Sequence, residues 1–272
     1  MKRKIESLRE LQLIQLDMLR EFDGFCRQNN INYCFAGGSA LGAIRHQGFI
    51  PWDDDIDIFI TRPNYEKLLE RAKDGISEHC VLNCPEWNPE FLGYIPKIEL
   101  IGSIVKMGTI KVEHDIQLGL SLFVCDGVSK YKWIQKCYFR KMYVYKALYA
   151  LTVNNLELAN SSLARKAGPA LAVFFKSAKS KKYRDKILKL MKKYPYEKSV
   201  MIAPTADTRA FWEVEEKSIF EQYSYVDFEG EKYPVRGNCK KYLERYYGDY
   251  MALPPKEEQI GKHDIQVWVE EK

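Results

Sequence analysis

Residues 53–60 read Asp-Asp-Asp-Ile-Asp-Ile-Phe-Ile, and this stretch constrains the fold more than any other part of the chain. Charged and apolar residues alternate with period two, which is the pattern of a strand that buries one face. We expect Asp53, Asp55 and Asp57 to point to one side of the strand while the isoleucines point into a core. Three carboxylates should therefore converge on one face of a sheet.

A glycine-rich turn precedes these acids, with fifteen residues between Ser39 and Asp55. Gly37, Gly38 and Ser39 follow a short apolar run that predicts a buried strand, and Ser39 is expected to cap the short helix after it. Glycine allows close approach of the backbone, and a helix N-terminus offers N–H groups to a phosphate. At the end of this helix, Arg45 and His46 would add positive charge.

Asp55 and Asp57 are the predicted metal ligands and catalytic residues. At positions i and i+2 of a strand their backbones lie about 7 Å apart, so the side chains can share one or two hard cations. Mg²⁺ suits such ligands, with Mn²⁺ as an alternative, and it leaves positions open for phosphate oxygens in an in-line displacement. An isolated acidic run is more often a solvated loop. The nearby glycine-rich turn and the apolar alternation favour the metal site.

Periodicity and turn residues predict the other elements. An amphipathic helix is expected to open the chain, and a hairpin and a short helix to close it before a charged, exposed tail. The predicted segments are helices over 5–28 and 63–73, strands over 95–107 and 119–125, a hairpin over 225–235 and a helix from Asn238 through Tyr247.

The charge is divided unevenly along the chain. The formal net charge of the whole chain is only +5, but between Lys130 and Lys193 there are 17 Lys and Arg residues against Glu157 and Asp185, a local net charge of +15. Composition there shifts to Lys, Tyr, Leu and Ala with helical periodicity. We expect a core at 1–127, a basic helical insertion at 128–204, and at 205–272 a hairpin and helix that complete the core.

The cysteines and the N-terminus predict a cytoplasmic protein. Seven cysteines are scattered through apolar surroundings, unlike the even, dense sets of secreted domains. The first residues carry no signal-peptide pattern, and no apolar run approaches the roughly 18 residues of a membrane-spanning helix. His79 with Cys80 and Cys84 could suggest zinc, but the spacing favours ordinary thiols.

Residues 35–69, FAGGSALGAIRHQGFIPWDDDIDIFITRPNYEKLL, resemble the signature of the LicD family, the phosphocholine-transferase group that includes the fukutin-related proteins. The resemblance returns in FEGEKYPV at 228–235 and in YLERYYGDYMALPP at 242–255. It implies an α+β nucleotidyltransferase fold, with a mixed sheet and flanking helices into which the basic lobe is inserted.

The resemblance also implies a reaction: phosphocholine, or a similar phospho-substituent, passes from a CDP-activated donor such as CDP-choline to a hydroxyl of a cell-surface glycan. Asp55 and Asp57 would hold the metal, and Gly37, Gly38 and Ser39 would lie at the donor phosphates. Two alternatives remain. One is a nucleotidyltransferase that modifies a small hydroxylated molecule, and the other is a catalytically impaired copy that binds a glycan or a partner.

One position departs from the family pattern. Relatives usually carry a third aspartate in a segment like GLDIFVYD, whereas residues 119–126 read GLSLFVCD, with Ser121 in the place of the acid. Serine is not an ionised metal ligand near neutral pH. Either Asp126, Asp115 or Glu113 takes over that role, or turnover is weakened.

Two further residues are candidates for substrate binding. Lys97, on the strand predicted after the acids, could reach a phosphate, although an exposed lysine is the simpler reading. His263 follows the family-like tail and is otherwise an ordinary surface histidine.

The basic lobe allows three interpretations. Lysines interleaved with aromatic residues could form a nucleic-acid surface, or the helices could simply be solvated. The resemblance favours a third: a glycan acceptor built on a lipid carrier, with peripheral contact to an anionic membrane at its inner face.

Overall fold

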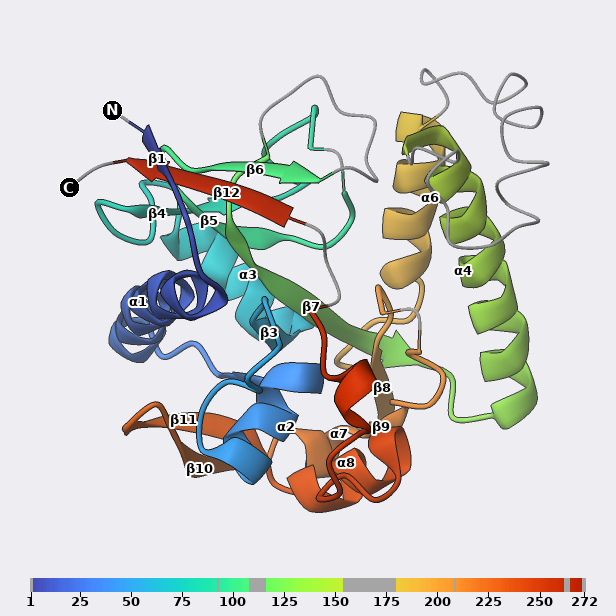
Figure 1. Cartoon of the computed structure of the whole chain (residues 1–272). Coiled ribbons are helices and arrows are strands. Elements are labelled where there is room, and N and C mark those ends of the chain that lie inside the picture. Colours follow the sequence, from blue (N-terminus) through green and yellow to red (C-terminus); the bar gives the residue numbers. More distant parts are fainter. Residues whose placement is uncertain are drawn as a thin grey trace.

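The computed structural model describes residues 2–91, 93–107, 116–153, 180–207, 209–261 and 265–270. At its centre lies a mixed sheet of seven strands in the order β2-β3-β7-β5-β4, with β8 and β9 continuing from β7 (Figure 1). Only β3 and β7 pair in parallel; the other neighbours are antiparallel. The strands are β2 (Tyr33–Phe35), β3 (Asp57–Thr61), β4 (Cys80–Asn83), β5 (Lys97–Leu100), β7 (Gly119–Val128), β8 (Met201–Pro204) and β9 (Glu215–Glu216). The predicted mixed sheet with flanking helices is confirmed.

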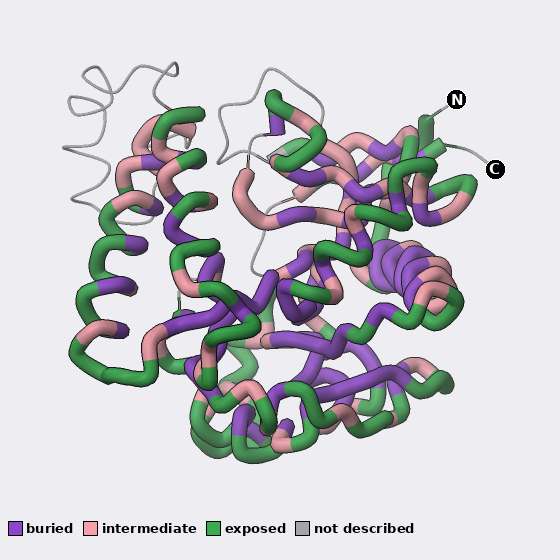
Figure 2. The backbone as a smooth tube through the Cα atoms, turned by 180° about the vertical axis from the view of Figure 1, so that it is seen from behind, coloured by how far each residue is buried: buried purple, intermediate pink, exposed green. Residues whose placement is uncertain are grey.

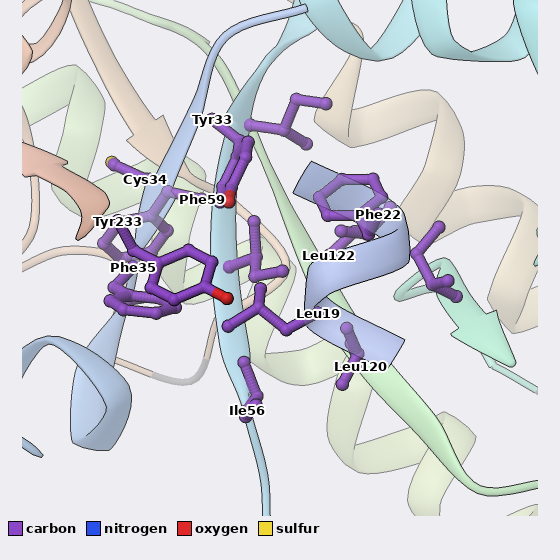
Figure 3. Packing of buried hydrophobic residues seen from close by; sticks show 14 of the residues in the cluster. Leu19, Phe22, Tyr33, Cys34, Phe35, Ile56, Phe59, Leu120, Leu122 and Tyr233 are labelled. Atoms are coloured by element: carbon purple, nitrogen blue, oxygen red, sulfur yellow. The ribbon is translucent and has the colours of Figure 1, made fainter. Parts of the chain in front are cut away.

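Helix α1 (Leu8–Gln28) packs its apolar stripe against the central sheet. The Ser7 side chain accepts a hydrogen bond from the Glu10 N–H and so caps the helix where the apolar periodicity begins. Leu19 and Phe22 are fully buried and lie against Leu120 and Leu122 of β7 (Figure 3). This packing fixes which side chains of β3 and β7 point into the core and which remain for a site.

The closing elements pack around α2 (Gly37–His46) and β3. The predicted hairpin is present as β10 (Tyr223–Phe228) and β11 (Glu231–Arg236), and the predicted closing helix as α8 (Cys239–Tyr247). Both residues of the hairpin turn have positive φ, 52° at Glu229 and 83° at Gly230, which matches the twist of the strands. Phe59 of β3 lies against Tyr242 of α8 and against Phe220 of α7 (Lys217–Phe220).

One strand prediction is wrong. Residues 95–107 are not one strand, because the chain turns at Gly102 with φ of 76°. After this turn β6 (Ile104–Met107) joins a second sheet, of order β1-β12-β6. Its other strands are β1 (Lys2–Lys4) and β12 (Ile265–Glu270), so residues 265–270 of the predicted tail form a strand. Val267 and Val269 are only 3% and 7% exposed, since alternate residues of β12 face the core.

The basic region forms a helical pair at the end of β7. Helices α4 (Lys132–Val153) and α6 (Ser180–Met191) pack side by side around their own apolar cluster (Figure 1). Buried residues face the partner helix and exposed ones line the outside (Figure 2). Two of the charges are internal: Lys146 donates to the carbonyls of residues 205–207, and Arg184 to those of Pro89 and Phe91. The domain boundaries themselves stay a prediction.

The remaining described elements are α3 (Arg62–Arg71) and a short 3₁₀ turn, Lys256–Glu258. All seven cysteines have free thiols, and Cys80 and Cys84 are buried, which agrees with their interpretation as ordinary thiols. Within the described ranges, no helix combines the length and the apolar content that crossing a bilayer requires.

Candidate metal and phosphate site

Asp53, Asp54 and Asp55 form a carboxylate cluster just before β3. One oxygen from each lies within 4.8 Å of the others, Asp53 and Asp54 are each 4% exposed, and Asp55 is half-buried. Carboxylate oxygens at this spacing suit a hard cation such as Mg²⁺. The donor set therefore fits the predicted metal, although the cluster is not the expected pair.

The predicted alternation of the acids is wrong, because β3 begins only at Asp57. The acids before it belong to a loop that α1 holds in place: the side-chain amide of Gln12 donates to the Asp53 carbonyl at 2.9 Å, and that of Gln15 to the Asp54 carbonyl at 2.8 Å. These buried glutamines satisfy carbonyls that a strand would have used in its ladder. Three consecutive carboxylates can then gather, which a strand would prevent.

The Asp53 carboxylate lies against the first turn of α2. A Cβ atom added to Gly38 would meet Asp53 Oδ2 at 2.4 Å, so only glycine allows this approach. Negative charge is favoured there by the helix dipole. The α2 N-terminus and Asp53 thus lie next to each other, and their role as one site stays a prediction.

Asp57 is fixed to the same turn through its backbone. Its N–H donates to Ser39 Oγ at 2.9 Å, and its carbonyl accepts from the Ala36 N–H at 2.9 Å. Ser39 therefore lies inside the helix, whose N-cap is Ala36, and the prediction that Ser39 caps it is wrong. Asp57 Oδ2 lies near Gly37, 3.6 Å from where a Cβ of that residue would be.

Two residues of the site escaped prediction, Tyr242 and Glu213. The Gly37 N–H donates to the Tyr242 hydroxyl at 3.0 Å, and this hydroxyl donates to Glu213 Oε1 at 3.0 Å. Burial, with a further contribution from Asp207, raises the pKa of Glu213 to about 8. The Gly37 N–H therefore already has a partner within the protein. Phosphate binding at Gly38 and Ser39 stays a prediction.

A row of polar residues crosses the sheet beside Asp57. Strand register places Ser121 of β7 opposite Asp57, Lys97 of β5 opposite Ser121, and Asn83 of β4 opposite Lys97. Paired residues in register share a face of the sheet, and all four are half-buried. The structure thus brings together three predicted site residues, Asp57, Ser121 and Lys97.

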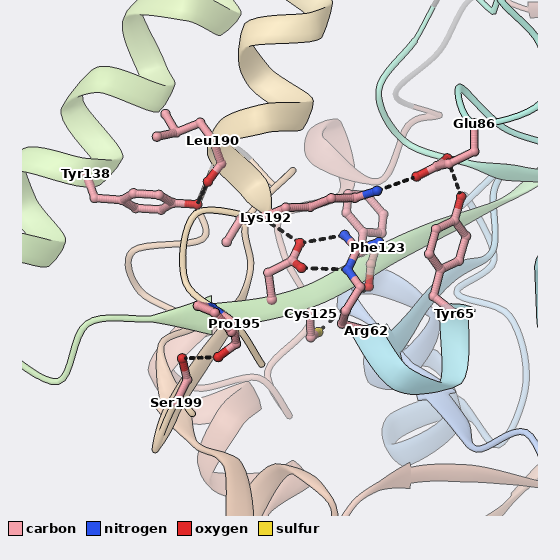
Figure 4. Close-up of polar contacts among 12 residues, drawn as sticks. Arg62, Tyr65, Glu86, Phe123, Cys125, Tyr138, Leu190, Lys192, Pro195 and Ser199 are labelled. Carbon is pink, nitrogen blue, oxygen red and sulfur yellow. Dashed lines mark hydrogen bonds and ion pairs between the residues drawn. The ribbon is translucent and has the colours of Figure 1, made fainter. Parts of the chain in front are cut away.

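Asp126 does not replace the third acid. It lies five residues beyond Ser121, about 16 Å along the strand, and opposite Ala203 of β8. Its carboxylate accepts from Arg62 Nε at 2.7 Å and Nη2 at 2.9 Å (Figure 4). Burial raises its pKa while Arg62 opposes that rise. This alternative is wrong because the carboxylate is held in a buried ion pair at the far end of β7.

Arg45 and His46 lie at the opposite end of α2 from the acids, about 14 Å along the helix. Arg45 Nη1 donates to the carbonyls of Tyr250 and Ala252 at 3.0 and 3.1 Å, and its Nε donates to His46 Nε2 at 3.0 Å. Burial lowers the pKa of both residues, and the charge of Arg45 lowers that of His46 further. Arg45 thus anchors the segment after α8, and a substrate role for either residue stays a prediction.

His263, Asp115 and Glu113 lie outside the described residues.

Comparison with known proteins adds the family to this geometry. Residues 30–83, which include the α2 turn, the acids and β3, match the family described as LicD/FKTN/FKRP, nucleotidyltransferase domain. This segment of the chain therefore matches the LicD/FKTN/FKRP nucleotidyltransferase domain. The whole chain is 28% identical over 271 residues to the lipopolysaccharide cholinephosphotransferase LicD of Haemophilus influenzae, covering 97% of this chain and 98% of that protein.

Two rickettsial proteins match part of this chain. An uncharacterized protein of Rickettsia prowazekii is 44% identical over 95 residues, which is 29% of this chain and 35% of that protein. Another, from Rickettsia typhi, is 44% identical over 73 residues, or 26% and 23%.

Proposed function

We propose that this protein is a Mg²⁺-dependent transferase that moves phosphocholine from CDP-choline to a hydroxyl of a cell-surface glycan. The observation that carries the proposal is the gathering of Asp53 to Asp55 and Asp57 around the first turn of α2. It is supported by the near full-length similarity to a protein named a lipopolysaccharide cholinephosphotransferase.

The cluster of Asp53, Asp54 and Asp55 would hold the metal together with Asp57. Asp55 and Asp57 would be the catalytic ligands. A bound Mg²⁺ would neutralise charge on the donor phosphates. Gly38 and the α2 dipole favour an anion at the same place, and Ser39 fixes the backbone of Asp57. In a phosphoryl transfer, such positioning and charge stabilisation provide most of the catalysis.

The bonds exchanged are specific. The acceptor hydroxyl oxygen attacks the phosphorus that carries choline, and the bond from that phosphorus to the bridging oxygen breaks. CMP leaves with the bridging oxygen, and the hydroxyl proton passes to a carboxylate of the cluster. Lys97, in the row beside Asp57, is suited to contact a phosphate oxygen as a point charge.

The test is CMP release from CDP-choline by the purified protein, with Mg²⁺ and a glycan acceptor. Asp55→Asn and Asp57→Asn should each lower the rate by roughly 100-fold or more, because a charged ligand is lost, while circular dichroism stays unchanged. Asp17→Asn on the exposed side of α1 is the matched control. A wild-type protein that releases no CMP would contradict the proposal.

The two alternatives give different products. A nucleotidyltransferase acting on a small molecule would leave CMP attached to that molecule. An impaired copy that only binds glycan would give no metal-dependent heat when CDP-choline is titrated in a calorimeter.

A further inference from the structure

Ser121 places a neutral hydroxyl beside Asp57, in the middle of the polar row. It stands directly between Asp57 and Lys97, one strand spacing from each, or about 4.8 Å. Two-metal sites for in-line displacement hold their ions roughly 3.5–4 Å apart and need carboxylates around both. A neutral hydroxyl beside Asp57 does little to hold a second divalent ion.

The Lys97 side chain crosses β7 at Gly119, two residues before Ser121. Burial raises the pKa of Glu99, and the nearby charge of Lys97 opposes that rise. The Cβ and Cδ atoms of Lys97 each lie 3.2 Å from where a Cβ of Gly119 would be, so its aliphatic part runs over the bare backbone of β7. Gly119 pairs with Glu99, two residues before Ser121. The missing side chain at Gly119 is what gives the lysine room to cross from β5 onto β7, on the side of β3 and its acids.

We propose that the Lys97 ammonium takes the place of a second metal ion, so that the protein works with one divalent cation and one lysine. The inference rests on the proposed function and deepens it. The ammonium supplies a fixed positive charge where Ser121 cannot retain a cation, and it faces the phosphate oxygens that acquire negative charge as the bond to CMP breaks. No bond forms at Lys97, and it stays protonated throughout.

Counting bound metal ions tests the proposal without relying on turnover. Mn²⁺ is used as the probe, and the loss of the free-ion signal in electron paramagnetic resonance is measured with CMP present. The wild type and Lys97→Met should each bind one Mn²⁺ per chain. The double variant Ser121→Asp/Lys97→Met should bind two, because it restores a carboxylate and removes the competing ammonium.

Turnover provides the second measurement. Lys97→Met should lower kcat by about 100-fold or more, on the scale of a lost charge-stabilising group, and Lys97→Arg should retain more activity than Lys97→Met. The double variant should recover at least about tenfold over Lys97→Met. Lys232→Met, on the exposed hairpin, is the control and should stay within about twofold of the wild type.

Two results would overturn the inference: a wild type that binds two Mn²⁺ ions, or a Lys97→Met variant with normal kcat. Its failure differs from a failure of the proposed function. If the wild type released no CMP at all, the transferase proposal would fall, yet the ion counts of the wild type and the double variant would still decide the role of Lys97.

Discussion

Replacing Asp126 with asparagine tests whether its carboxylate serves stability or catalysis. Asp126 and Arg62 form a two-pronged ion pair whose side chains are 3% and 7% exposed. Removing one partner leaves the other charge buried without compensation, which costs about 3–5 kcal/mol. The comparable exposed pair, Arg20 with Asp17, has side chains 43% and 59% exposed and should be worth less than about 1 kcal/mol.

Thermal unfolding measures this difference. At roughly 2–4 °C per kcal/mol for a chain of this size, Asp126→Asn should lower Tm by about 6–20 °C. Asp17→Asn should lower it by no more than about 4 °C. Assayed well below its Tm, the Asp126 variant should keep near-normal CMP release per folded molecule, because its carboxylate lies about 16 Å from Ser121 along β7.

The opposite result for Asp126→Asn would show that Asp126 acts in catalysis and not in stability. If Asp126→Asn abolished CMP release and left Tm unchanged, Asp126 would be the missing third acid and the ion pair would contribute little to stability.

Three further predictions test other parts of the molecule. Gly38→Ala should weaken Mg²⁺ binding by at least about tenfold in calorimetry, since its methyl group would displace the Asp53 carboxylate, whereas Gly24→Ala on α1, with nothing within 4 Å, should leave binding unchanged. Burial raises the pKa of Glu213 from 4.5 to about 8, so the folded protein binds this proton more tightly than the unfolded chain does. This contribution to stability is fully present below about pH 4.5 and is lost as the pH rises through about 8. Glu213→Gln should therefore flatten the fall of Tm over that range. The basic lobe should bind anionic vesicles at low salt and release them as salt rises. Replacing the exposed Lys181 and Lys182 with Gln should weaken vesicle binding by up to roughly 1 kcal/mol per charge without slowing CMP release. If no vesicles bind at any salt concentration, the lobe is a solvated surface.

Local patterns predicted the elements whose stability is mostly local. The apolar periodicity of α1 and the turn at Glu229-Gly230 each determined an element to within a few residues. The strands β1 and β12 were missed because each is short and pairs with the opposite end of the chain, with Lys2 opposite Glu270. A strand pattern of three to six residues does not specify its partner.

The sequence predicted several residues of the candidate site, but it did not predict how they are arranged in space. The sequence placed Asp57 and Ser121 on two strands, and the register bears out that they are neighbours. It could not show that Gln12 and Gln15 hold the preceding acids out of the strand, because that depends on how α1 packs. Tyr242 was hidden for the same reason: its contact with Gly37 joins residues 205 positions apart.

The basic lobe illustrates the limit of composition. Not all of the +15 charge lies on its surface, because Lys146 and Arg184 are buried and hold backbone carbonyls in place. Burial lowers the pKa of Lys146 to about 8, and Asp207 opposes that shift. Arg184 is therefore unsuitable for a vesicle-binding test, because its replacement would disturb the contacts with residues 89 and 91.

Mass spectrometry of surface glycans shows whether the protein transfers phosphocholine in cells. Glycans from cells that carry the gene would be compared with those from cells that lack it and from cells that express only the Asp57→Asn variant. We expect glycans heavier by one phosphocholine group only in the cells that carry the intact gene. Identical glycans in all three would contradict a transferase function, and an added group other than phosphocholine would contradict the proposed donor.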